Sequence, residues 1–196
     1  MTYRAILDKL LKKTQSPVKG HIGFSPEKKN SIISNHFGAA VFHGHLNALK
    51  WISSHDTKVD IEFKAEEKPS IEGRALRKEV TGYTPLMLAI MRGDSNLMII
   101  KYLVDTLKCN VKAKDNFGNT VVHLAVKYGC EEIVKYFVKE KKMEAFDRNF
   151  EGKAAVITAR EKGFVNIESI FTQLDGSADK VLFIHSLIDP RTNKSE

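Results

Sequence analysis

The sequence predicts an all-α solenoid of about four helix-turn-helix repeats, with β-hairpin fingers between the repeats and helical caps at the ends. Two observations lead to this fold class. Three stretches of the chain align on one another, and their shared glycines, Gly82, Gly118 and Gly152, are spaced 36 and 34 residues apart. Each stretch also contains a segment with the i, i+3, i+4 apolar spacing of an amphipathic helix. Such a period indicates units that each pack only against their neighbours.

The second and third units resemble the ankyrin repeat. The positions that carry the resemblance are Gly82, Thr84, Pro85, Leu86, Ala89 and Gly93 in the second unit, and Gly118, Thr120, His123, Leu124, Ala125 and Gly129 in the third. The resemblance implies two antiparallel helices in each repeat, followed by a finger that projects at roughly a right angle. It also implies that the ends of the first helices and the fingers are free to vary and to bind a partner.

The chain is divided accordingly into a leader, four repeats and a tail. We expect the boundaries to be 1–31 for a basic N-terminal leader, 32–80, 81–115, 116–149 and 150–176 for the repeats, and 177–196 for a C-terminal cap with a polar end. The first and fourth units match the pattern less well than the middle two. Terminal units of a solenoid commonly diverge in this way.

The leader carries most of the net charge of +7. Residues 1–31 contain seven Lys or Arg and two acids. Within it Tyr3, Leu7 and Leu10 lie on one stripe of a predicted amphipathic helix. This helix covers the first repeat, or alternatively it lies on a membrane surface, docks on a partner or directs the chain to mitochondria. Ser16 and Ser25 each precede a proline and are alternative phosphorylation sites.

The first repeat is longer than the others. Ala40 and Ala89 are 49 residues apart, and the extra length lies within 58–78. Val59, Ile61 and Phe63 alternate with charged residues, which predicts a half-buried strand and an enlarged hairpin finger. Such an insertion is either part of a binding face or a tolerated surface loop.

The resemblance implies a hydrogen-bond network between repeats, made by a threonine and a histidine of each unit. We expect the network to be complete only in the third repeat, at Thr120 and His123. The fourth repeat has Ala154 and Ile157 at these two positions.

The cysteine content and hydropathy predict an intracellular, cytoplasmic protein. The two cysteines, Cys109 and Cys130, form no disulfide pattern, so we expect free thiols in a reducing compartment. No apolar run reaches the length of a membrane span, and no secretory signal precedes the repeats.

The sequence gives no indication of catalysis. His36, His43 and His45 are close together, but their spacing does not form a helical pair of metal ligands. No glycine-rich phosphate loop, nucleophile elbow or zinc-protease motif is present. We therefore expect a protein that is not an enzyme and needs no cofactor or metal.

The positions free to vary form a stripe of aromatic and basic residues, which predicts a binding surface for a protein partner with an acidic face. The candidate residues are Phe42, His43, Tyr83, Met91, Arg92, Asn116, Phe117, Asn119, Lys127, Tyr128, Phe150, Lys153 and Lys162. An adaptor, an inhibitor and a secreted effector are all compatible with this surface.

Two alternatives remain open at this stage. One is a monomeric subunit of a larger assembly that inserts its leader and tail into neighbouring proteins. The other is nucleic-acid binding through basic patches, since the isoelectric point is about 9.3.

Overall fold

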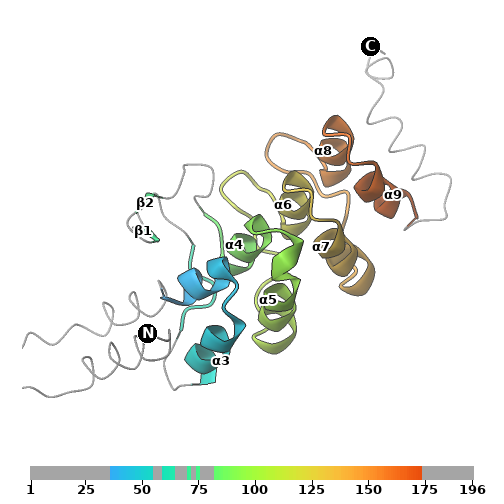
Figure 1. The fold of residues 1–196 in the computed structure, drawn as a ribbon. Coiled ribbons are helices and arrows are strands. Elements are labelled where there is room, and N and C mark those ends of the chain that lie inside the picture. The colour runs from blue at the N-terminus through green and yellow to red at the C-terminus, as the bar shows by residue number, and fades with distance from the viewer. Residues whose placement is uncertain (1–35, 55–58, 65–69, 72–73, 76–81, 174–196) are drawn as a thin grey trace, which may run out of the picture.

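The computed structural model describes residues 36–54, 59–64, 70–71, 74–75 and 82–173. These residues form successive helix pairs that stack side by side (Figure 1). The helical segments are residues 36–43, α3 (Leu46–Ser54), α4 (Pro85–Met91), η2 (Asp94–Asn96), α5 (Leu97–Lys101), η3 (Tyr102–Thr106), α6 (Val121–Lys127), α7 (Glu131–Lys135), η4 (Tyr136–Glu140), α8 (Ala155–Glu161) and α9 (Val165–Gln173).

The pairs confirm the predicted repeat solenoid. The first helices α4, α6 and α8 form one row, and the second helices α3, α5, α7 and α9 form another (Figure 1). Between the rows lies one continuous apolar core that runs through the described repeats. Each unit therefore buries its hydrophobic residues only by packing on the next.

The first helices begin at the threonines that the repeat pattern predicts. Thr84 caps α4 because its side chain accepts a hydrogen bond from the Met87 backbone N–H, and Pro85 occupies the first helical position. In α6, Thr120 and His123 form a reciprocal capping box. The threonine hydroxyl thus accepts a hydrogen bond from one of the backbone N–H groups in the first turn, which have no partner within the helix.

The second helices of the middle repeats end in a wide π-helical turn. The Leu107 N–H donates to the Tyr102 carbonyl, and the Lys141 N–H donates to the Tyr136 carbonyl. Lys108 and Lys142 then follow with positive φ values of 59° and 54°. This turn redirects the chain away from the helix pair toward the next finger.

The fingers differ from the regular β-hairpins that we predicted. In the described residues, strands are confined to β1 (Ser70–Ile71) and β2 (Arg74–Ala75), which pair antiparallel, and to one isolated bridge between Arg148 and Ala154. The later fingers are irregular turns closed by side chains. Asp115 accepts hydrogen bonds from the backbone N–H groups of Phe117 and Asn119.

The prediction of a strand at 59–63 is wrong, because these residues include a turn and no strand. Their side chains are half-buried and pack against the core. Phe63 lies directly over Gly38, where an added Cβ would come within 2.8 Å of its ring. Alternating hydrophobicity here reflects packing against the first repeat, not pairing with another strand.

Hydrogen bonds through the core tie each repeat to the next. The Nε2 atom of His123 donates to the Lys153 carbonyl at 3.0 Å, which confirms the predicted network of the third repeat. Asn96 donates to the carbonyl of Val41 in the first repeat at 3.1 Å. Cys130 lies in the equivalent position, with its Sγ 3.7 Å from the Ile90 carbonyl oxygen.

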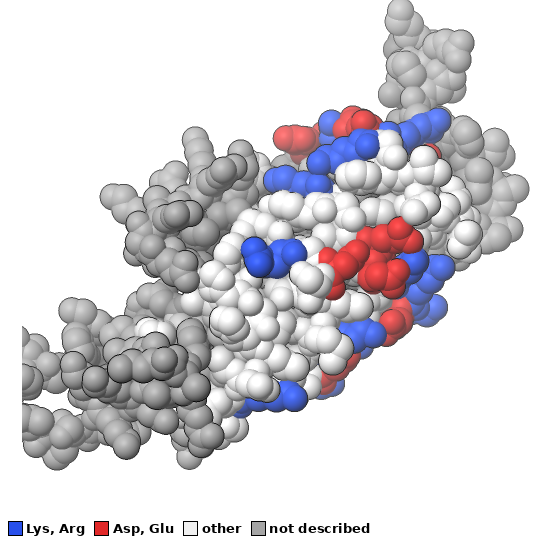
Figure 2. Space-filling view, viewed as in Figure 1, with Lys and Arg blue, Asp and Glu red and all other residues white. Residues whose placement is uncertain are grey.

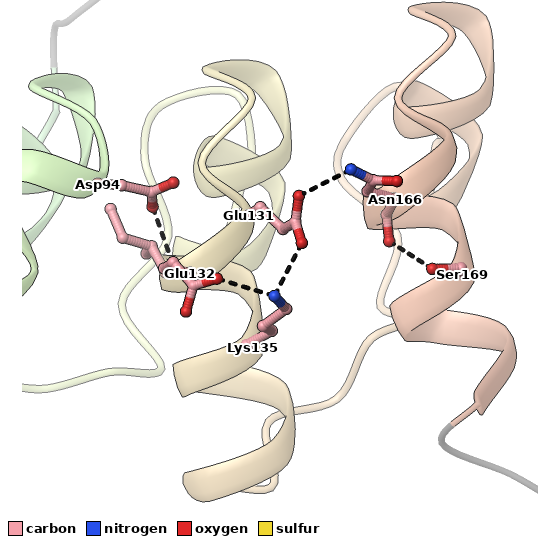
Figure 3. Close-up of polar contacts among 7 residues, drawn as sticks. Asp94, Glu131, Glu132, Lys135, Asn166 and Ser169 are labelled. Atoms are coloured by element: carbon pink, nitrogen blue, oxygen red, sulfur yellow. Dashed lines mark hydrogen bonds and ion pairs between the residues drawn. The ribbon is translucent and has the colours of Figure 1, made fainter.

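A second set of ties lies at the starts of the second helices (Figure 3). Asp94 of the second repeat accepts a hydrogen bond from the Ile133 N–H, so it caps α7 of the next repeat. Glu131 pairs with Lys135 at 2.8 Å and accepts from Asn166 of α9 at 3.2 Å. These contacts extend from the second repeat to the fourth.

Several sequence predictions lie outside the described residues. They are the leader at 1–31, the tail at 177–196, both Ser-Pro sites and most of the insertion at 58–78. The boundaries of the domains stay predictions.

Candidate functional site

The ends of the first helices in the first two repeats bring Phe42 and Arg92 together. The Arg92 guanidinium carbon lies 5.3 Å from the centre of the Phe42 ring, and the Arg92 side chain is exposed. The Phe42 ring also meets His43 edge to face, with ring centres 5.1 Å apart. His43 and Met91 are half-buried beside them. The structure therefore forms an aromatic and basic surface where the sequence predicted one.

The corresponding residues of the third and fourth repeats make more internal contacts. The Lys127 ammonium lies 5.8 Å from the Tyr128 ring centre. Lys162 donates to the Lys127 carbonyl at 2.9 Å, so its side chain spans from the fourth repeat back to the third. Lys153 forms a two-oxygen ion pair with Glu161, at 3.0 and 3.1 Å. Lys153 and Lys162 are therefore less available to a partner than Arg92, and Lys127 is half-buried.

Two phenylalanines are exposed on adjacent fingers. Phe117 is 43% exposed and Phe150 is 76% exposed. The backbone N–H of Phe150 donates to the Phe117 carbonyl at 3.0 Å, so the two residues lie side by side. The Phe150 ring covers Gly118, where an added Cβ would lie 2.6 Å from its Cδ1 atom. Phe150 therefore packs on the neighbouring finger and is exposed at the same time.

Asparagine side chains hold the two fingers in register. Asn119 donates to Asp115 at 3.0 Å and accepts from Asn149 of the next finger at 2.9 Å. Asn149 also accepts from the backbone of Lys153. Asn116 is exposed and lies against Gly82 of the preceding finger. Asn119 thus positions the fingers, and its side chain is half-buried.

The prediction that Tyr83 is an exposed binding residue is wrong. Its side chain is fully buried, and its hydroxyl lies 3.3 Å from that of Tyr128. In the second repeat the side chain at this position points inward, and its ring fills the core behind the finger. Tyr83 therefore supports the position of Tyr128 from inside.

Sequence reasoning did not identify the exposed apolar residues on the second helices. Met98 is 65% exposed and Val165 is 71% exposed. A signal for Met98 was present. Ile99, Ile133 and Ile167 are buried and evenly spaced along the chain. Met98 directly precedes the first of them and therefore aligns with the polar residues Glu132 and Asn166, which indicates an exposed position.

Charge is unevenly distributed over the visible face. Figure 2 shows basic and acidic atoms together along its upper edge and a second acidic group near the middle, with a wide area of other residues beside it. Lys135 holds the pKa of Glu131 below its usual value through a hydrogen bond. The acids at the start of α7 are thus already paired within the protein (Figure 3).

The titratable groups with shifted pKa values are structural. Burial lowers the pKa of His123, whose ring holds the third repeat against the fourth. Burial raises the pKa of the Cys109 and Cys130 thiols to about 12. Within the described ranges no three His, Cys, Asp or Glu side chains form a group that would hold a metal ion. This arrangement of side chains suits binding.

No helix among the described residues is long and apolar enough to cross a membrane.

The model for ankyrin repeats in three copies matches residues 36–149. The chain belongs to the ankyrin-repeat family. Ankyrin repeats are protein–protein interaction modules, and the family is generally non-enzymatic. No curated protein matches the sequence.

Among solved structures, 402 chains match, so structural likeness by itself selects no partner. One is in the crystal structure of the yeast ribosomal protein Rps3 in complex with its chaperone Yar1. It is 22% identical with a TM-score of 0.59, and the match covers 74% of this chain and 93% of that one. This likeness supports the ankyrin fold.

Proposed function

We propose that this ankyrin array binds a protein partner through the exposed fingers and the ends of its first helices, and that it acts in the cytoplasm without catalysing a reaction. The observation that carries the proposal is the pair Phe117 and Phe150. Both rings are exposed on adjacent fingers. Exposed aromatic residues on a rigid support are typical anchors of protein interfaces.

The fingers are held in place before any partner binds. The Asn119 and Asn149 amides link the two turns, and the backbone bond between the phenylalanines fixes their separation. A surface that is already ordered loses less conformational entropy on binding. The rings are thus suited to insert into a partner's apolar pocket, with Asn116 and Lys153 on the polar rim.

The cytoplasmic assignment follows from the thiols. Cys109 and Cys130 are both free and buried, and reduced thiols of this kind persist in reducing compartments. Adaptor, inhibitor and effector roles all use the same surface.

Affinity capture from a cell lysate tests the proposal. The unmodified protein, a Phe117→Ser, Phe150→Ser variant and a Val165→Ser control would be compared at moderate salt. We expect a specific protein to be retained by the unmodified protein and the control and lost from the double variant. The control removes an equally exposed apolar side chain from another part of the surface.

The melting temperature of each variant must stay close to that of the unmodified protein, because exposed side chains contribute little to folding. Equal recovery of the same protein by all three forms would place the binding surface away from the fingers.

A further inference from the structure

Among the described residues, the helices of the first repeat and the first helix of the second repeat carry no carboxylates. Residues 36–54 and 82–93 contain no Asp or Glu. The nearest acid that follows, Asp94, is directed at the N-terminus of α7 and accepts from the Ile133 N–H at 3.0 Å. In the described part of the insertion, Glu62 accepts from the Asn110 N–H on the finger side at 2.7 Å. No acid from these segments is therefore directed at Arg92.

Arg92 is the exposed cation of this surface, and its position is fixed from two sides. Its backbone N–H closes the end of α4 by donating to the Ala89 carbonyl, and the N–H of the following Gly93 donates to the Ile90 carbonyl. Its guanidinium lies over the Phe42 ring. Among the described residues Arg92 forms no ion pair. A guanidinium stacked on a ring keeps its edge free to donate two parallel hydrogen bonds.

The surroundings of Arg92 are apolar. Phe42 and Met91 are half-buried beside it. The other predicted cations differ, because Lys153 is paired with Glu161 and Lys162 is bound to the Lys127 carbonyl. Lys127 lies over the Tyr128 ring as Arg92 lies over Phe42, but it is half-buried where Arg92 is exposed. Charge and apolar surface thus coincide at Arg92.

We propose that Arg92 is the anion anchor of the partner-binding surface, and that it binds the carboxylate of an Asp or Glu flanked by large apolar side chains in a peptide segment of the partner. The carboxylate accepts two hydrogen bonds from the guanidinium, and the flanking side chains pack on Phe42 and Met91. One guanidinium matches the single charge of a carboxylate. The inference rests on the proposed function and specifies the chemistry of the partner.

The test selects binders from a displayed library of random peptides, each long enough to span two repeats, against the full chain. A selected peptide is then synthesised with a fluorescent label, and its dissociation constant is measured by anisotropy. The protein forms are the unmodified chain, Arg92→Glu, Arg92→Lys and a Lys139→Glu control. Lys139 is an exposed lysine on η4 and gives the same change of net charge as Arg92→Glu.

We expect the selected peptides to share an acidic residue next to large apolar residues. Arg92→Glu should weaken binding by about tenfold or more, as for other close charge pairs. Arg92→Lys should weaken it several-fold because the two parallel bonds are lost, and the control should change it by less than about twofold. A peptide with Lys in place of its acid should bind Arg92→Glu more tightly than the unmodified chain.

Peptides without a shared acid, or acidic peptides that bind Arg92→Glu as well as the unmodified chain, would overturn the inference. So would a selection that returns no binder, since the proposal asserts a peptide epitope. None of these results contradicts the proposed function, which is tested separately by the loss of captured protein from the Phe117→Ser, Phe150→Ser variant. Only failure of the affinity capture would contradict both the proposed function and the role of Arg92.

Discussion

His123 is expected to contribute more to stability than any exposed charge of the array. The Nε2–H group donates to the Lys153 carbonyl at 3.0 Å, and Nδ1 lies 2.9 Å from the Thr120 hydroxyl and 3.3 Å from its backbone nitrogen. Because a carbonyl can only accept, Nε2 carries the proton and Nδ1 is the acceptor. The ring thus satisfies the N-terminus of α6 and joins the third repeat to the fourth.

Replacing His123 with alanine removes both functions at once. Each lost hydrogen bond costs about 1 kcal/mol, and a buried backbone group left unsatisfied adds about 1 kcal/mol or more. The free energy of unfolding should therefore fall by about 3 kcal/mol, with a decrease in melting temperature of roughly 6–12 °C for a chain of this size. Urea denaturation followed by circular dichroism measures this difference. His45→Ala, at an exposed histidine, is the control.

A loss below about 1 kcal/mol in His123→Ala would show that the network is not a structural tie. A loss as large in His45→Ala would show that the effect is not specific to the buried ring.

The same residue predicts how stability depends on pH. Burial lowers the pKa of His123 in the folded state below the ordinary value of 6.5, so the unfolded chain binds more protons in the interval between the two values. The free energy of unfolding therefore falls as pH decreases through about 6.5 and levels off below the folded-state pKa. For one proton the slope is at most about 1.4 kcal/mol per pH unit.

Denaturation between about pH 7.5 and pH 5.5 checks this dependence. The unmodified chain should lose more stability over this range than His123→Ala. Parallel pH profiles would contradict the assignment of the neutral ring.

Two further predictions concern buried thiols and a finger glycine. Burial raises the pKa of Cys109 and Cys130 to about 12, so iodoacetamide should modify the native protein slowly at mildly alkaline pH and rapidly in urea. Mass spectrometry measures the modification, and fast modification of the native protein would contradict the burial of these thiols. Gly118→Ala and Gly152→Ala should each lower stability by about 1–2 kcal/mol because both positions have positive φ, with a larger loss at Gly118, where the Phe150 ring lies in the way. When Phe150 is also replaced by alanine, thermal denaturation should show equal losses of stability for Gly118→Ala and Gly152→Ala. A larger loss at Gly118 that remains in this background would show that the Phe150 ring is not its cause.

The sequence was sufficient for the fold because the repeat pattern is local. The spacing of Gly82, Gly118 and Gly152, and the Thr120 and His123 pair, specify turns and caps that form within one unit and recur in the next. Residues that fill equivalent positions can be assigned by alignment. Met98 could have been recognised as exposed in this way, from its alignment with Glu132.

The candidate surface was predicted less completely. The alignment of the repeats correctly placed Phe42, Arg92, Phe117 and Phe150 at helix ends and fingers. It did not predict that the Tyr83 side chain points into the core. Whether an aromatic ring on a finger points inward depends on the space left by the neighbouring repeat. That space is set by contacts between units, which a periodic pattern does not encode.

By itself the sequence determined an array of ankyrin repeats and the Thr120 and His123 network of the third repeat, and it predicted a set of candidate binding residues. Only the tertiary structure decided which of those residues are committed to internal contacts. Lys153 and Lys162 are held by Glu161 and the Lys127 carbonyl, whereas Arg92 lies over Phe42 and forms no ion pair with any acid that the structure describes. The physical reason is that a charge is neutralised by its neighbours in space, and in a solenoid those neighbours belong to other repeats.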